Sequence, residues 1–295
     1  MTINPPLTHI GIIGDVHQYF DPFDVDTFNQ SDYSLLLFVG DLGNYRHHEG
    51  IKMARIMAKL TKPALFIPGN HDTVHGLQLL AEIKQWQLLT KLFAQGQPRR
   101  MRQLQKALGP VSFCGYSTHS FAENEFDIIV GRPYSMGGSQ FKYRHHLQKQ
   151  FGIDNMEASA QKLIQCVDAA QSNHLIFLAH SGPTGLGSRK GDIWGCDFRP
   201  EEGDFGDWDL QQAIEYAQSI GKRIIAVFGG HMHHAVKGGG KRPFHLIKNS
   251  VNYVNAARVP RIFEENDCFI HHHIQLSFNE TEIQIKERLV NQHER

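Results

Sequence analysis

The chain of 295 residues has little cysteine, no excess charge of either sign and no long apolar run. Its 30 Lys and Arg residues balance its 30 Asp and Glu residues, so the net charge is zero when His is neutral. Nucleic acid or an anionic membrane as the main partner would favour a basic excess. No apolar run approaches the roughly 20 residues that cross a bilayer. We therefore expect neither a membrane nor nucleic acid among the partners.

The four cysteines form no recognisable motif. Cys114, Cys166, Cys196 and Cys268 are scattered and include no C-x-x-C pair, which disfavours both a zinc ribbon and a dithiol redox site. Scattered cysteines are typical of reduced thiols inside the cell. Residues 1–7 lack the basic and apolar regions of a signal peptide. We expect a soluble, cytoplasmic protein, and the sequence does not fix its oligomeric state.

The chain also lacks internal repeats and Pro/Ser-rich linkers, which favours a single domain over residues 1–295. The segment 121–150 has no clear periodicity and is the expected site of an insertion. Its Gly-rich stretch 132–139 is a candidate lid.

Five short apolar runs predict buried strands. Runs of this kind, rich in Ile, Val, Leu and Phe, are typical of strands covered on both faces. They lie at 9–13, 35–39, 64–67, 175–179 and 224–228. Stretches with helical spacing lie at 49–60, 76–92, 155–171 and 207–220. The alternation predicts a layered α/β fold, and residues 269–278 and 281–290 predict a C-terminal hairpin.

Histidine is abundant, with 19 residues, as many as phenylalanine. Polar side chains follow each of the five predicted strands, and these are Asp15, His17, Asp41, Asn70, His71, Asp72, His180, His231 and His233. Taken singly, Asp15 and Asp41 are compatible with turns or N-caps, and His180 with a core histidine. Because ligands bind at the carboxyl ends of strands in open α/β sheets, we expect the whole set to converge.

The expected cluster has the chemistry of a dinuclear metal centre. Two Asp, one Asn and four His offer seven nitrogen or oxygen ligands and no thiolate. That is too many for one tetrahedral zinc, but it suits two ions that share a bridging carboxylate. Paired ions stabilise an in-line displacement at phosphorus and lower the pKa of a bound water. The expected guest is a phosphoryl anion.

Five ordered motifs resemble those of calcineurin-like metallophosphoesterases. They are Gly-Asp-Val-His at 14–17, Gly-Asp at 40–41, Gly-Asn-His-Asp at 69–72, His180, and Gly-His-Met-His at 230–233. The resemblance spans most of the chain. It implies a four-layer α/β/β/α sandwich with mixed sheets. It also implies hydrolysis of a small phosphodiester or phosphomonoester by in-line attack of a metal-bound hydroxide.

The resemblance implies a role for each motif residue. One ion would be bound by Asp15, His17 and His233, Asp41 would bridge, and Asn70, His180 and His231 would complete the second site. His71 would contact the phosphoryl oxygen or protonate the leaving group, with Asp72 holding its ring in orientation. Mixed imidazole and carboxylate ligation suits two divalent transition-metal ions such as Mn, Fe or Zn.

The motifs also bear on the substrate. Protein Ser/Thr phosphatases continue the second motif as Gly-Asp-x-x-Asp-Arg-Gly, whereas residues 40–45 here read Gly-Asp-Leu-Gly-Asn-Tyr. A nuclease needs an electropositive track, which the zero net charge does not favour. A non-catalytic binding module on the same fold is the alternative. Arg189, after the fourth motif, is a candidate phosphate contact together with Asn70 and His71. Segments 185–194 and 203–209 resemble a subgroup from cyanobacteria and plants, which implies no substrate.

The other fourteen histidines have no assigned chemistry. We expect the pairs 47–48 and 145–146 on exposed surface, and 271–273 on a solvated strand face. His234 receives no role. The basic clusters 99–102 and 237–242 are expected to be solvated as well.

Overall fold

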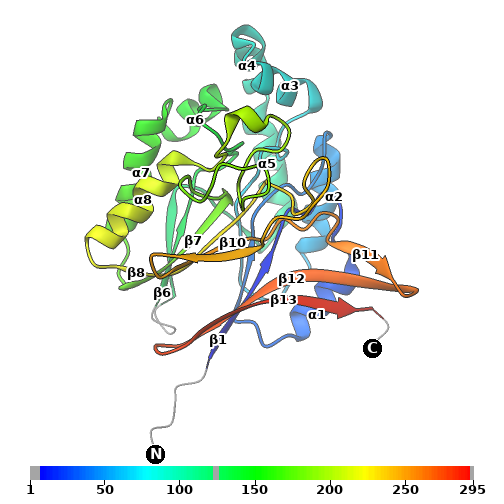
Figure 1. Ribbon diagram of the computed structural model, residues 1–295. Helices are drawn as coiled ribbons and strands as arrows, with labels where there is room; N and C mark the ends of the chain where they lie inside the picture. Colours follow the sequence, from blue (N-terminus) through cyan, green and yellow to red (C-terminus); the bar gives the residue numbers. More distant parts are fainter. Residues whose placement is uncertain (1–6, 122–125, 293–295) are drawn as a thin grey trace, which may run out of the picture.

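The computed structural model describes residues 7–121 and 126–292, which form two mixed β-sheets (Figure 1). The first sheet has the order β11 (Ile262–Glu265), β12 (Cys268–Phe278), β1 (Thr8–Ile13), β2 (Leu35–Phe38), β3 (Ala64–Phe66) and β4 (Ser112–Phe113), with β13 (Ile283–Asn291) also paired to β12. The second has the order β5 (Ser117–Phe121), β6 (Phe126–Val130), β7 (His174–Ser181), β8 (Arg223–Gly230), β10 (Val251–Asn255) and β9 (His245–Lys248).

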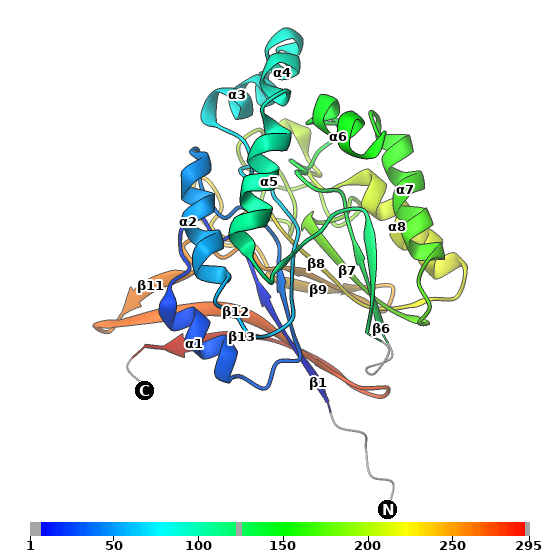
Figure 2. The ribbon, with the colours of Figure 1, turned by 180° about the vertical axis from the view of Figure 1, so that it is seen from behind.

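Eight α-helices accompany the sheets within the described residues. They are α1 (Pro22–Gln30), α2 (His47–Met57), α3 (Gly76–Lys84), α4 (Gln87–Ala94), α5 (Gln97–Leu108), α6 (Arg144–Phe151), α7 (Met156–Asp168) and α8 (Trp208–Ser219). Three apolar cores lie between the layers. Side chains of α1, α2 and α5 pack on the first sheet, the two sheets pack on each other, and α7 and α8 pack on the second sheet. The predicted four-layer α/β/β/α sandwich is therefore confirmed (Figure 2).

The loops that carry the polar motifs lie at one end of both sheets because of the direction of their strands. In the first sheet β1, β2, β3 and β4 run parallel, and in the second β6, β7, β8 and β10 do. The five predicted strands are confirmed as β1, β2, β3, β7 and β8, and the C-terminal hairpin as β12 and β13. The polar motifs therefore follow strands whose carboxyl ends share an edge.

One prediction about helices needs correction, and one helix described below was not predicted. The helix expected over 76–92 is two helices, because Gln85 adopts a left-handed conformation with φ of 55° and ends α3. α1 was not predicted, although Asp21 forms a capping box with Asp24 and Pro22 begins the helix. The predicted insertion at 121–150 stays a prediction, but its bounds must leave out β6, because that strand lies inside the second sheet between β5 and β7.

Several side chains expected on the surface are buried. His271, His272 and His273 on β12 are each at most 3% exposed, and His146 on α6 is 1% exposed. The prediction of solvated faces was wrong at these positions: Phe23 and Phe28 of α1 pack against His271 and His273, His234 lies beside His272, and Tyr134 packs against His146. Arg242 is also buried, and its guanidinium donates to the carbonyls of Lys190, Asp192 and Gly195.

Among the described residues, no helix is long and apolar enough to cross a membrane.

Candidate metal centre

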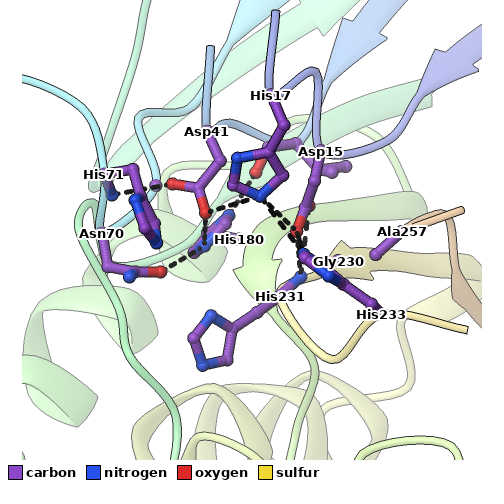
Figure 3. A network of polar contacts seen from close by, with 12 residues as sticks. Asp15, His17, Asp41, Asn70, His71, His180, Gly230, His231, His233 and Ala257 are labelled. Carbon is purple, nitrogen blue, oxygen red and sulfur yellow. Dashed lines mark hydrogen bonds and ion pairs between the residues drawn. The ribbon is translucent and has the colours of Figure 1, made fainter. Parts of the chain in front are cut away.

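The loops after five strands bring the predicted ligands together (Figure 3). The first sheet supplies Asp15, His17, Asp41 and Asn70 from the ends of β1, β2 and β3, and the second supplies His180, His231 and His233 from β7 and β8. Most of these side chains are buried, and that of His233 is 40% exposed. The set thus lies at the junction of the two sheets and opens to solvent on one side.

The first group of ligand atoms surrounds Asp15. The Nε2 atom of His233 lies 3.4 Å from the Oδ2 atom of Asp15 and 3.2 Å from the Nε2 atom of His17. The His17 Nε2 atom is 3.7 Å from the Oδ2 atom of Asp41. One ion at this point can therefore reach Asp15, His17 and His233, with Asp41 on its other side.

The second group shares the same Asp41 oxygen. The Nε2 atom of His180 is 3.5 Å from the Asp41 Oδ2 atom and 3.0 Å from the Asn70 Oδ1 atom. The His231 ring stands beside that of His180, with centroids 5.3 Å apart. Asp41, His180 and His231 each offer one ligand atom within 4.8 Å of the others. Asp41 lies between the two groups, as a bridging carboxylate must.

The candidate ligand atoms fit divalent cations because histidine Nε2 atoms and side-chain oxygens point their lone pairs at one another. The Nδ1 atoms of His17 and His180 contact the carbonyl oxygens of Gly43 and Val39 at 3.1 and 2.6 Å, so each Nδ1 carries the proton. Each Nε2 then presents a lone pair to a carboxylate or amide oxygen. Such a cluster is unfavourable without a positive charge at its centre, and two metal ions supply it.

Electrostatics within the cluster agree with that fit. Burial favours neutral carboxyls, but the neighbouring imidazoles outweigh it and lower the pKa of Asp15 and of Asp41. Burial, reinforced by the neighbouring imidazoles, lowers the pKa of His231 to about 3, so this ring is neutral and its lone pair is available. Burial likewise lowers the pKa of His17, against the opposing carboxylates. Charged carboxylates and neutral imidazoles are the protonation states in which these groups bind metals.

Two of the imidazole rings, those of His180 and His233, bind protons more strongly than an ordinary histidine does. Burial alone would lower the pKa of His180 and of His233, but the nearby Asp15 and Asp41 carboxylates outweigh it and raise both values. A cation that binds here must therefore displace protons from these two rings, which makes its affinity fall as the pH is lowered.

The backbone of the ligand loops is strained or closely packed. His17, Asp41 and His231 adopt left-handed conformations with φ of 41°, 52° and 67°. Gly230 cannot carry a side chain, since a Cβ there would lie 2.1 Å from the Asp15 Oδ1 atom. That close approach lets the His231 amide donate to the Asp15 carboxylate at 3.1 Å.

Asp72 does not touch the His71 ring, so the predicted role of orienting it is wrong. Its carboxylate accepts the backbone N–H groups of Asp41, Leu42 and Gly69 at 2.8, 3.0 and 2.9 Å. Burial and the nearby Asp41 carboxylate raise the pKa of Asp72, and the amide donors oppose that shift. Asp72 therefore holds the loops after β2 and β3 together and sets the position of Asp41.

His71 is held by the chain beside it. Its Nδ1 atom contacts the Asn44 carbonyl, so Nδ1 carries the proton, and its amide donates to the Asp41 Oδ1 atom at 2.8 Å. The ring packs edge-on against those of Tyr45 and His17. Nε2 is the free ring atom, and the His71 side chain lines a cavity.

That cavity, of about 470 Å³, adjoins the centre. Asn70, His71 and His231 are among the residues that line it. The remaining walls combine apolar and charged side chains, among them Leu79, Ile83, Met136, Phe205, Lys84, Lys142 and Glu202. The cavity therefore offers space for a ligand beside the candidate metal centre.

Two expectations from the sequence concerned Arg189 as a phosphate contact and the stretch 132–139 as a lid. In the structure Arg189 lies away from the cavity, and the stretch forms part of its wall. The Arg189 side chain is 89% exposed, lies 3.4 Å from the Asp192 carboxylate, and is not among the cavity residues. The Gly-rich stretch offered as a lid is buried from 132 to 135. Arg132 donates to Asp207 and Asp209 at 2.5 and 2.8 Å, which anchors the stretch as a cavity wall.

Sequence reasoning missed several contributors to the site. The carbonyls of Gly43 and Val39 set the histidine tautomers, yet a backbone acceptor leaves no mark in the sequence. The ion pair of Arg132 with Asp207 and Asp209 was also missed. Its signal was present, since an Arg within an otherwise small and apolar stretch needs a partner when buried.

Comparison with known proteins places the chain among phosphoesterases. The model of the calcineurin-like phosphoesterase family matches residues 8–235. One crystal structure aligns with a TM-score of 0.57 at 11% identity, covering 96% of this chain and 99% of that chain. The crystal structure of TT1561 of Thermus thermophilus aligns with a TM-score of 0.54 at 10% identity, covering 95% of this chain and 98% of that chain. At these identities the likeness shows the fold alone. No curated protein matches the chain.

Proposed function

The chain belongs to the calcineurin-like phosphoesterase family, and on that premise we propose that it hydrolyses a small phosphodiester or phosphomonoester. One ion would be held by Asp15, His17 and His233, the other by Asn70, His180 and His231, with Asp41 between them. The observation that carries the proposal is the convergence of metal-ligating atoms from two sheets on Asp41, next to a cavity lined by Asn70, His71 and His231.

When bound, two divalent ions supply an activated water for in-line attack and neutralise the phosphoryl oxygens. The side chains divide the remaining work. Asn70 and His71 line the cavity beside the candidate metal ligands, where the phosphoryl group would bind. His71 presents Nε2 there because its Nδ1 proton is engaged by the Asn44 carbonyl. A protonated Nε2 would donate to a phosphoryl oxygen or to the departing oxygen.

Asp72 supports these residues without contacting substrate. It fixes the amides of Asp41 and Gly69, and Gly69 directly precedes the two residues proposed to contact the phosphoryl group. By holding the Asp41 backbone, Asp72 would position the carboxylate that both ions are proposed to share.

The experiment compares metal-loaded protein with two variants on aryl phosphodiesters and monoesters. Wild-type protein should contain two equivalents of transition metal and lose turnover after chelation. Asp41→Asn should lose metal and activity together. His71→Ala should keep both metals while kcat falls about 100-fold or more. Wild-type turnover in both variants would contradict the proposal. If the variants behave as expected, a panel of nucleotides and sugar phosphates would then narrow the substrate.

A further inference from the structure

Helices α3 and α4 carry an unusual concentration of exposed apolar side chains. Among the described residues fifteen large apolar side chains are exposed, and seven of them lie between residues 77 and 92. They are Leu77, Leu80, Ile83, Trp86, Leu88, Leu89 and Leu92. Leu88 is 85% exposed, and Leu92, one turn further along α4, is 56% exposed. Exposed apolar side chains gathered on two consecutive helices mark a surface that binds something apolar.

The patch lies on a projecting part of the molecule. Figures 1 and 2 show α3 and α4 standing out beyond the layers, at the opposite end from both termini. A projecting tip cannot enclose a partner helix as a groove does. Its shape suits insertion into a soft, extended surface.

The exposed charges on the segment that carries the patch are all of one sign, whereas the carboxylates of Glu202 and Asp154 line neighbouring cavities from other elements. Residues 76–108 contain six Lys and Arg residues and one carboxylate, Glu82. Glu82 is buried, where its carboxylate accepts the Tyr143 amide at 3.0 Å. Lys84, Lys91 and Arg99 are exposed. Leu and Trp side chains flanked by cations on the same helices are typical of elements that bind anionic lipid interfaces.

The same charges disfavour a second copy of the chain. In a symmetric contact a surface meets itself, so the exposed cations of this segment in one copy would face those in the other. An anionic lipid surface compensates these charges and accepts the apolar tip. The zero charge of the whole chain, on which the expectation of no membrane partner rests, averages over this local asymmetry.

We propose that the α3–α4 surface, formed by the exposed apolar residues between 77 and 92 with Lys84 and Lys91, binds the interface of anionic lipid bilayers. The contact is peripheral, since no described helix can span a membrane. The surface continues into the cavity beside the metal centre, because Leu79, Ile83 and Lys84 of α3 line it. Bound in this way, the chain would hold its cavity close to the lipid headgroups.

The test is co-sedimentation of the full chain with vesicles, which requires no turnover and so stands apart from the proposed hydrolysis. Wild-type protein should sediment with mixed phosphatidylcholine and phosphatidylglycerol vesicles, and less as salt is raised. Phosphatidylcholine vesicles should retain at least tenfold less protein. Trp86 fluorescence should shift to shorter wavelength on binding, and Trp86→Phe should lose that shift.

Leu88→Glu with Leu92→Glu should reduce vesicle binding at least tenfold, and Lys91→Glu should reduce it several-fold. Ile247→Glu is the matched control, because Ile247 is 66% exposed on the edge strand β9, and it should bind as wild type does. Circular dichroism confirms that each variant is folded. Equal binding to neutral vesicles, or binding that survives the double substitution, overturns the proposal. A dimer that the double substitution dissociates, without vesicle binding, also overturns it and assigns the surface to a second copy.

Discussion

Single residues in this site hold the backbone in position, and Asp72 is the clearest case. The motif Gly-Asn-His-Asp places it next to His71, which suggests a side-chain contact. The structure instead directs its carboxylate to three backbone amides on two loops. Adjacency in sequence therefore did not predict the partner, because the direction of a side chain depends on local φ and ψ.

Asp72→Asn should lower metal content and thermal stability together. An amide can accept only through its oxygen, so its NH₂ group would face at least one of the three amides, at a cost of about 1–3 kcal/mol. Metal analysis and thermal unfolding of the variant test this against His71→Ala, which should keep both metals. If Asp72→Asn kept both ions and its stability and lost only kcat, the side chain would be acting on His71 after all.

At the scale of elements, β12 shows how a helix that was not predicted, α1, buries side chains of a strand that were expected in solvent. His271 and His273 pack against Phe23 and Phe28 of α1. Asp24 of the same helix lies 3.1 Å from the His271 Nδ1 atom and accepts two hydrogen bonds from the buried Arg261. Asp21, Asp24 and His271 also lie close enough together to hold a metal ion. Because Arg261 already neutralises Asp24, we interpret this cluster as an internal ion pair rather than a metal site.

The histidines of β12 should make the fold sensitive to acid. Burial lowers the pKa of His273 from 6.5 to about 3, so the unfolded chain binds this proton more readily than the folded chain does. Its contribution to stability is complete above 6.5 and is lost as pH falls through that value toward about 3. From about pH 7 to about pH 5 the loss is about 2 kcal/mol.

His273→Gln tests that contribution, since the amide oxygen can still accept from the Tyr33 hydroxyl, which lies 2.7 Å from the native Nε2 atom. In urea unfolding of metal-free protein, the variant should lose about 2 kcal/mol less than wild type between the two pH values. His48→Gln, at an exposed position, is the control and should follow wild type. Parallel pH profiles for all three proteins would show that His273 does not titrate with unfolding.

The sequence predicted those elements whose pattern is local. Apolar runs identified β1, β2, β3, β7 and β8, because strands buried on both faces need no alternation. β6 was missed, since Asp127 interrupts its apolar run, yet that carboxylate is buried and accepts the Ser172 amide at 2.9 Å. The seven ligand positions followed from strand ends and motifs. Buried partners such as Arg132 and Asp207 could not, because they meet only after the second sheet and α8 have formed.

At the scale of the whole molecule, the proposed metal centre would join the two sheets. Asp15, Asp41 and Asn70 extend from the first sheet, and His180 and His231 from the second. Without cations, the facing lone pairs and two buried carboxylates repel one another, so the sheets are held at this edge by packing and by a few hydrogen bonds, among them those from the His231 amide to Asp15 and from His180 to the Val39 carbonyl. With cations, the same atoms attract both sheets to a common centre.

Metal removal should therefore weaken the whole fold and not only the site. Each ion stabilises the folded chain by about 3 kcal/mol when free metal is about 100 times the dissociation constant. For a chain of this size that amounts to a rise of several degrees in Tm. Chelation should reverse the rise, and amide hydrogen exchange should speed up in the loops after both β1 and β8. Asp41→Asn should abolish the metal-dependent shift, whereas Asp32→Asn, at a side chain 73% exposed, should keep it. A Tm independent of metal, or faster exchange confined to one sheet, would show that the ions do not connect the two sheets.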